Sequence, residues 1–287
     1  MKKILMILMS TMMMLSCGRS KESDKDVLVV SIEPQRYLLE QIVGDKMDVV
    51  SIVGKGADPE SFDPSVSTLG LVERSKVFFT IGSGAFEDNL IARLKESGAD
   101  IRTVDCRDGI AMIAGGAHAG GDCGHNHEDE YDPHVWTSPA NMRVVAKNMY
   151  DALVEIEGEK CYKERYDSLI ARIDAVAEQM DSILRPMKGT SFLVWHPSLS
   201  YLARDYDLNQ IAIGAENKEL SAAAFKQKID EARQHDSAVF FIQPDSDAGR
   251  SESVAKQTGS RMVEINPLSY DWPGEMIKIA TAIAQTK

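Results

Sequence analysis

The segment EKCYKERYDSLIARIDAVAEQMDSILRPM, residues 159–187, lies near the middle of this 287-residue chain and contains no glycine. Its apolar side chains recur at intervals of three and four, the spacing of one helix face: Tyr162, Tyr166, Leu169, Ile173, Val176, Met180, Ile183 and Leu184. A helix over residues 159–185 would be roughly 40 Å long at about 1.5 Å per residue, enough to span two lobes. The apolar face could instead form a coiled-coil dimer. We expect a monomer in which this face packs along two sheets.

The sequence on each side of this segment follows one layout, in which short β-branched runs alternate with helical patterns. The runs are VLVVSI (27–32), MDVVSIV (47–53), VFFTIG (77–82) and IRTVD (101–105), then SFLVW (191–195), LNQIAI (208–213), AVFFIQ (238–243) and RMVEI (261–265). This alternation predicts an α/β fold of two lobes, each a four-stranded, mostly parallel sheet flanked by helices. We expect an N-terminal lobe over 27–156, a linking helix over 157–187 and a C-terminal lobe over 188–287.

The first twenty residues, MKKILMILMSTMMMLSCGRS, join two lysines to an apolar run and then to small residues. This is the pattern of a secretory signal peptide, and the run is too short for a membrane-spanning helix. The sequence around Cys17 resembles the lipobox of bacterial lipoproteins, which implies a signal peptide over 1–17, a lipidated cysteine and a polar tether over 18–26. We therefore expect a periplasmic or extracytoplasmic protein held to the membrane only by this anchor, with a soluble secreted protein as the alternative.

The net charge of −12 bears on the class of partner. An acidic protein repels nucleic acids and anionic membrane surfaces and attracts cations. Besides Cys17 the chain has Cys106, Cys123 and Cys161, an odd number from which no disulfide framework follows. Neither a Walker glycine loop nor a Gly-x-Ser-x-Gly elbow occurs, so phosphate or acyl chemistry has no support.

Three segments that follow predicted strands carry side chains able to bind a metal, and open α/β sheets build their sites at such strand ends. The first, residues 54–64, contains Glu60. The second ends in DPHVWTSP, which places His134 beside a proline, and the third begins at His196, also beside a proline. Because prolines stiffen the backbone, both imidazoles can be ordered at little entropic cost.

The second segment is also rich in histidine over residues 115–131. His118, Cys123, His125 and His127 lie there among glycines. We expect a loop that captures metal weakly, while a solvated polar linker is the alternative.

Four motifs together resemble a known family: GADPESFDPS (56–65), YDPHVWTSPANMRVVAKNM (131–149), WHPSLSYLARDYDL (195–208) and INPL (265–268). They are similar to the metal-binding solute-binding proteins of bacterial ABC importers, in the zinc-binding, ZnuA-like branch. The resemblance implies a two-lobed clamp with a long backbone helix, a metal held in the cleft and delivery of that metal to a membrane permease.

The resemblance also implies ligands. His134 and His196 match the ligands of the family, whereas Glu60 replaces its usual histidine and Asn266 replaces its usual acidic residue. Water or Asp271 could complete the coordination.

Two imidazoles and a carboxylate suit zinc with one open position, and they would accept manganese or iron if more oxygens joined. The histidine-rich segment favours zinc, because zinc-type members of the family carry one. An alternative of another class is a zinc-dependent hydrolase with Glu60 as general base, but the His-Glu-x-x-His signature is missing. We therefore expect a carrier and no enzymatic activity.

Overall fold

The computed structural model describes residues 25–114, 131–214, 221–244 and 246–285, and it contains two parallel sheets. The N-terminal sheet has the order β2-β1-β3-β4, and its strands are β1 (Val27–Val30), β2 (Asp48–Ser51), β3 (Val77–Thr80) and β4 (Thr103–Asp105). The C-terminal sheet repeats this order as β6-β5-β7-β8, with β5 (Ser191–Val194), β6 (Asn209–Ala212), β7 (Val239–Ile242) and β8 (Arg261–Glu264). Every strand pair is parallel, which confirms the predicted fold class.

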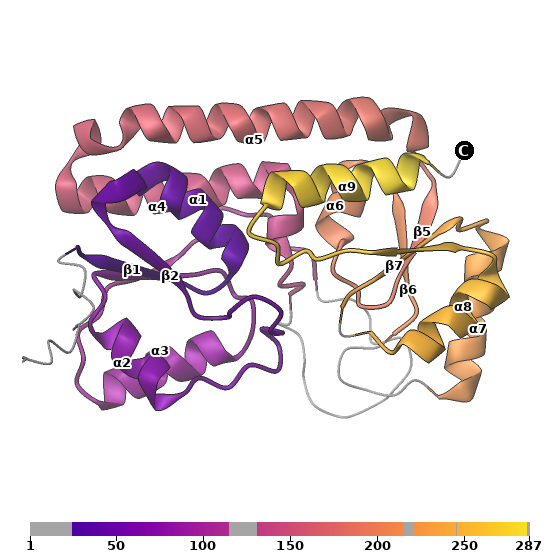
Figure 1. Ribbon diagram of the computed structural model, residues 1–287, viewed down its shortest axis with the longest axis horizontal. Helices are drawn as coiled ribbons and strands as arrows, with labels where there is room; N and C mark the ends of the chain where they lie inside the picture. Colours follow the sequence, from indigo (N-terminus) through magenta and orange to yellow (C-terminus); the bar gives the residue numbers. More distant parts are fainter. Residues whose placement is uncertain (1–24, 115–130, 215–220, 245, 286–287) are drawn as a thin grey trace, which may run out of the picture.

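Helices cover both sheets (Figure 1). In the N-terminal lobe they are α1 (Glu33–Val43), α2 (Val66–Glu73), α3 (Phe86–Glu96) and α4 (Pro139–Glu157), and α4 is preceded by the 3₁₀ turn η2 (Val135–Thr137). The C-terminal lobe has α6 (Ser200–Asp205), α7 (Ala222–Gln234), α8 (Ala248–Thr258) and α9 (Trp272–Ala284). Within the described ranges no helix is both long and apolar enough to cross a membrane.

The helix α5 (Lys163–Leu184) runs along both lobes, as Figure 1 shows. It contacts α1 and α4 of the N-terminal lobe and α9 of the C-terminal lobe. Its buried residues belong to the predicted stripe: Leu169, Ile173, Val176, Met180 and Leu184. The helix starts later than the predicted residue 159, because Glu159–Cys161 form a separate 3₁₀ turn and Tyr162 has the non-helical φ of −130°.

One hydrophobic core continues from lobe to lobe. Phe78 and Phe79 of β3 belong to the same buried cluster as Phe192 of β5 and Phe241 of β7. The indole N–H of Trp272, at the start of α9, donates a hydrogen bond of 2.7 Å to the backbone carbonyl of Trp136 in η2. A second, smaller cluster around Phe240 covers the other face of the C-terminal sheet.

The two cysteines within the described residues, Cys106 and Cys161, are free thiols. Cys106 is fully buried at the end of β4, and burial raises the pKa of its thiol well above the ordinary value. Cys161 is partly exposed. Cys123 lies outside the described residues.

Truncation on the buried face of α5 tests how strongly the shared core holds the fold. Ile173 is buried against the core, so Ile173→Ala should lower the free energy of unfolding by about 2–5 kcal/mol, the usual cost of deleting a buried Ile side chain. Urea unfolding measures this change. Ser168→Ala on the exposed face of the same helix is the matched control and should change the free energy by less than about 0.5 kcal/mol. Equal effects of the two variants would show that the stripe does not carry the interlobe contact.

Candidate metal centre

The loop after β2 carries Glu60 and is shaped by its own side chains. Asp58 Oδ1 accepts a hydrogen bond of 3.0 Å from the backbone N–H of Glu60, and Asp58 Oδ2 accepts one of 2.8 Å from the Ser61 hydroxyl. An aspartate that binds the backbone two residues ahead closes a tight Asx turn. Two residues beyond Glu60, the ring of Phe62 packs edge-on against Phe86 at a centroid distance of 5.2 Å. The turn and this contact together hold Glu60 in one place.

The loop between β3 and α3 packs against the loop that carries Glu60. The buried carboxylate of Glu87 accepts hydrogen bonds from the backbone N–H groups of residues 81–83. Burial raises the pKa of Glu87 above its ordinary value, although these hydrogen bonds act in the opposite direction. The loop ordered in this way brings Gly84 against Pro59, where an added Cβ would lie 2.4 Å from the Pro59 carbonyl oxygen. Only glycine allows the two backbones to approach so closely.

His134 lies between Pro133 and the turn η2, and its side chain is only 6% exposed. Asp132 Oδ1 accepts hydrogen bonds from both the Nδ1 and the backbone N–H of His134, each at 2.9 Å. Burial raises the pKa of Asp132, but the hydrogen bonds and charge of His134, with a hydrogen bond from Ser200, together outweigh it and leave that pKa below the ordinary value. A carboxylate on Nδ1 orients an imidazole and leaves Nε2 as the metal-binding nitrogen.

His196 follows β5 directly after Trp195 and comes from the other lobe. Its backbone carbonyl accepts a hydrogen bond of 2.8 Å from Ser198 N–H, which turns the chain sharply toward α6. Trp195 continues the parallel ladder, because its N–H donates to the Phe241 carbonyl at 2.9 Å. His196 is thereby placed at the carboxyl edge of the C-terminal sheet with 21% of its side chain exposed.

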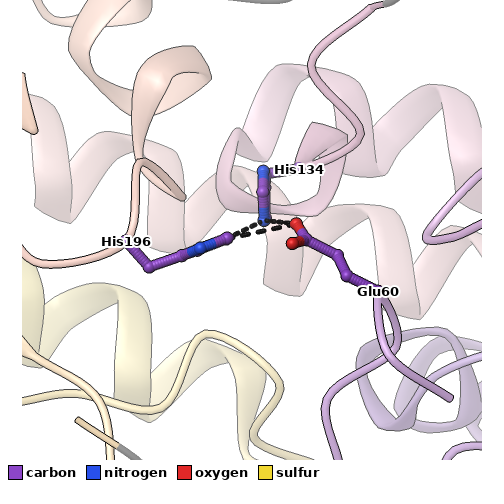
Figure 2. Close-up of side chains that lie close together, drawn as sticks. All are labelled: Glu60, His134 and His196. Carbon is purple, nitrogen blue, oxygen red and sulfur yellow. Dashed lines mark hydrogen bonds and ion pairs between the residues drawn. The ribbon is translucent and has the colours of Figure 1, made fainter. Parts of the chain in front are cut away.

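The three side chains converge between the lobes, as Figure 2 shows. The Nε2 atoms of His134 and His196 are 2.9 Å apart, and Glu60 Oε1 lies 3.6 Å from the former and 3.3 Å from the latter. The point equidistant from these three atoms lies about 1.9 Å from each, close to the bond lengths of about 2.0–2.2 Å that zinc makes to nitrogen and oxygen.

The charge and burial of these groups also favour a cation. Glu60 Oε1 is buried, and no hydrogen-bond donor reaches it from the described part of the chain. A buried carboxylate oxygen without a donor is costly unless a cation neutralises it. The arrangement can therefore hold a metal through two nitrogens and one oxygen and leave a coordination position open.

The side chains of the other two predicted ligands make local hydrogen bonds. Asp271 Oδ1 accepts from Gly274 N–H at 3.1 Å and so caps the start of α9. The side-chain oxygen of Asn266 accepts from Leu268 N–H at 3.1 Å, within a local turn. Each of these oxygens is engaged in a local hydrogen bond, and the roles of the two residues as ligands stay a prediction. The auxiliary residues His118, Cys123, His125 and His127 lie outside the described residues, as does Cys17.

Two carboxylates that support the site were not predicted from the sequence. Asp132 was noted only as part of a stiff Asp-Pro pair. An acidic residue two positions before a candidate ligand histidine could have predicted a carboxylate that orients the ring. Glu87 gave no signal, because it occupies an ordinary position in an amphipathic helix and acts on a loop that precedes that helix.

Comparison with known proteins identifies relatives over nearly the whole chain. The sequence profile of the family described as "ZnuA: Zinc-uptake complex component A periplasmic" matches residues 28–286. The zinc-binding lipoprotein AdcA of Streptococcus pneumoniae (strain TIGR4) is 24% identical over 93% of this chain, which spans only 56% of the length of AdcA. A putative metal-binding protein of Chlamydia trachomatis is 27% identical over 99% of both chains.

A solved structure agrees with this assignment. The crystal structure of a ZnuA deletion mutant with zinc bound superposes with a TM-score of 0.81 at 30% identity, covering 91% of this chain and 97% of the other. The profile match covers far more than half of the sequence and includes all three converging residues. The chain therefore belongs to the ZnuA family of periplasmic zinc-uptake components.

Proposed function

We propose that this protein is the high-affinity zinc-binding component of an ABC importer, which captures the ion outside the cytoplasm and delivers it to a membrane permease. The observation that carries this proposal is the buried, donor-free Oε1 of Glu60 facing the Nε2 atoms of His134 and His196. Relatives named as zinc-binding lipoproteins, and a relative crystallised with zinc, support the choice of ion.

The donor set favours zinc for a chemical reason. Zinc accepts imidazole nitrogen and carboxylate oxygen in a four-coordinate site, whereas manganese and iron favour more oxygen ligands. The three converging groups supply only one oxygen, from Glu60. Water, Asp271 or Asn266 would complete the shell. Manganese or iron remains the second candidate, and elemental analysis of protein purified without added metal, followed by competition titration, distinguishes these ions.

The proposed mechanism of capture follows from where the ligands come from. Glu60 and His134 belong to the N-terminal lobe, while His196 belongs to the C-terminal lobe. An ion bound to all three bridges the lobes, so binding stabilises their packed arrangement and release requires the ligands to separate. We further propose that residues 1–17 are a signal peptide, that Cys17 carries a lipid anchor, and that the tether over 18–26 holds the clamp near its permease.

A carrier explains the site better than a hydrolase does. A general base must stand beside the metal-bound water, whereas Glu60 Oε1 is directed at the same point as the two imidazoles. This geometry supports Glu60 as a ligand rather than as a base. A turnover assay on the zinc-loaded protein would detect hydrolysis if this assignment were wrong.

Removal of either imidazole should abolish tight binding. We expect His134→Ala or His196→Ala to weaken zinc binding by more than about 100-fold, since each removes a ligand itself, in competition titrations with a chromogenic chelator. Any single substitution within residues 118–127 should change affinity far less and affect only capacity or capture rate. His235→Ala, at an exposed position after α7, is the matched control and should bind as the wild type does.

The opposite pattern would contradict this site. If deletion of residues 115–128 abolished high-affinity binding while His196→Ala left it intact, the tight site would lie in the histidine-rich segment.

Substitution at Glu60 tests the departure from the family pattern. Glu60→Ala should weaken binding less than loss of a histidine does, because the two imidazoles remain. Glu60→His should keep the affinity within about ten-fold of the wild type or raise it, since it supplies a third imidazole at the same position. Both affinities are measured by the same competition titration. An affinity of Glu60→His below that of Glu60→Ala would show that the histidine cannot reach the ion.

Zinc affinity should depend on pH. Protons compete with metal for imidazole nitrogen, so the apparent affinity should fall as the pH drops from about 7.5 to about 5.5, with more than one proton taken up per ion released. Zinc should raise the melting temperature near neutral pH and lose this effect at the lower pH. Calorimetric titration and thermal melts at matched pH values test this. Binding that stayed constant over the range would indicate carboxylate ligands instead.

A further inference from the structure

The short helix α6 of the C-terminal lobe carries a tyrosine that reaches into the N-terminal lobe. Tyr201 is fully buried, and α6 contacts the turn η2 that follows His134. The helix follows His196 closely, because the tight turn at His196 and Ser198 leads directly into it. Tyr201 therefore moves with His196 while it lies among residues of the opposite lobe.

The hydroxyl of Tyr201 holds two separate pieces of N-terminal backbone. It accepts a hydrogen bond of 3.2 Å from the N–H of Ile113 and donates one of 2.8 Å to the carbonyl oxygen of Asp132. Ile113 and Asp132 flank the isolated antiparallel bridge between Ala114 and Tyr131. One hydroxyl of the C-terminal lobe thus binds the N-terminal lobe backbone on both sides of this bridge.

Asp132 connects this contact to the metal centre. While its carbonyl oxygen accepts from Tyr201, its carboxylate accepts from Nδ1 of His134 and sets the orientation of that ring. A displacement of the Asp132 backbone would therefore move the Nε2 of His134. In the C-terminal lobe, Tyr201 lies in the helix that begins four residues after His196. The hydroxyl consequently links the backbone that supports His134 to the helix that follows His196, in addition to the direct contact between the two Nε2 atoms.

We propose that Tyr201 is a positioning residue whose hydroxyl sets the separation of His134 and His196 across the lobes and so raises the affinity for the ion. This inference rests on the proposed function of the same site. Metal ligands must be held to within about 0.5 Å of their productive geometry, and polar groups behind the ligands provide that constraint. Arg204 reinforces the contact, because its guanidinium lies 5.0 Å from the Tyr201 ring centroid and donates to the Ala111 carbonyl at 2.9 Å.

The chain offers a matched pair of substitutions for the test. Tyr201→Phe removes only the hydroxyl and keeps the ring. Tyr150→Phe makes the same chemical change in α4, where the buried hydroxyl has no hydrogen-bond partner among the described residues and the ring stacks on Tyr166 at 4.2 Å. Both variants and the wild type are purified as the mature chain and stripped of metal.

Three measurements separate positioning from packing. Zinc affinity, from competition titration, should fall about ten-fold in Tyr201→Phe and stay unchanged in Tyr150→Phe. The visible absorption spectrum of the cobalt(II)-loaded protein should change only in Tyr201→Phe, because it reports the geometry of the ligands. Hydrogen exchange of the Ile113 amide in the metal-free protein should accelerate in the same variant.

A specific result would overturn the inference. If Tyr201→Phe lowered the melting temperature of the metal-free protein but left zinc affinity and the cobalt spectrum unchanged, Tyr201 would contribute to packing alone. The proposed function would then stand, because the wild type would still bind zinc and His196→Ala would not. Failure of the wild type to bind zinc would instead refute the proposed function, and this inference with it.

Discussion

The packing of the long helix α5 against both lobes is the interaction on which the rest of the structure depends. Its buried stripe contacts α1 and α4 on one side and α9 on the other, and it joins two sheets into one hydrophobic core. Because the ligands come from separate sheets, their distances are set by this packing and not by either sheet alone. A core of this kind resists bending, since close-packed side chains tolerate little displacement.

Electrostatics explains why a cation suits the point where the lobes meet. Glu60 and His134 are largely buried, and Oε1 of Glu60 has no hydrogen-bond partner among the described residues. Leaving such an oxygen unpaired costs free energy in the metal-free protein, and a divalent cation removes that cost on binding. Part of the proposed affinity for the ion therefore arises because binding removes the cost of burying Glu60 Oε1 without a hydrogen bond. The net charge of −12 acts at longer range by attracting cations toward the protein.

Each of the three converging side chains is supported by a further polar group. Asp58 shapes the turn of Glu60, Asp132 orients the ring of His134, and Tyr201 ties the Asp132 backbone to the helix that follows His196. Glu87 orders the loop on which Pro59 rests. Asp132, Tyr201 and Glu87 are buried, so each must be satisfied by a specific partner, and that requirement leaves few alternative conformations for the loops that they hold. The site is therefore organised largely before an ion arrives.

The sequence by itself determined the parts of this protein that depend on local pattern. Helical spacing predicted α5, repeated β-branched runs predicted two similar parallel sheets, and positions beside prolines at strand ends suggested His134 and His196 as candidate ligands. The exact start of α5 could not be predicted, because the turn at Glu159–Cys161 depends on how Tyr162 is buried. Only the tertiary structure decided that Glu60 meets both imidazoles and that Asp271 caps α9, since periodicity reports which face a residue occupies but not the distance between lobes. The contact of Tyr201 with Asp132 arises for the same physical reason, because it forms only when α5 has brought the lobes together.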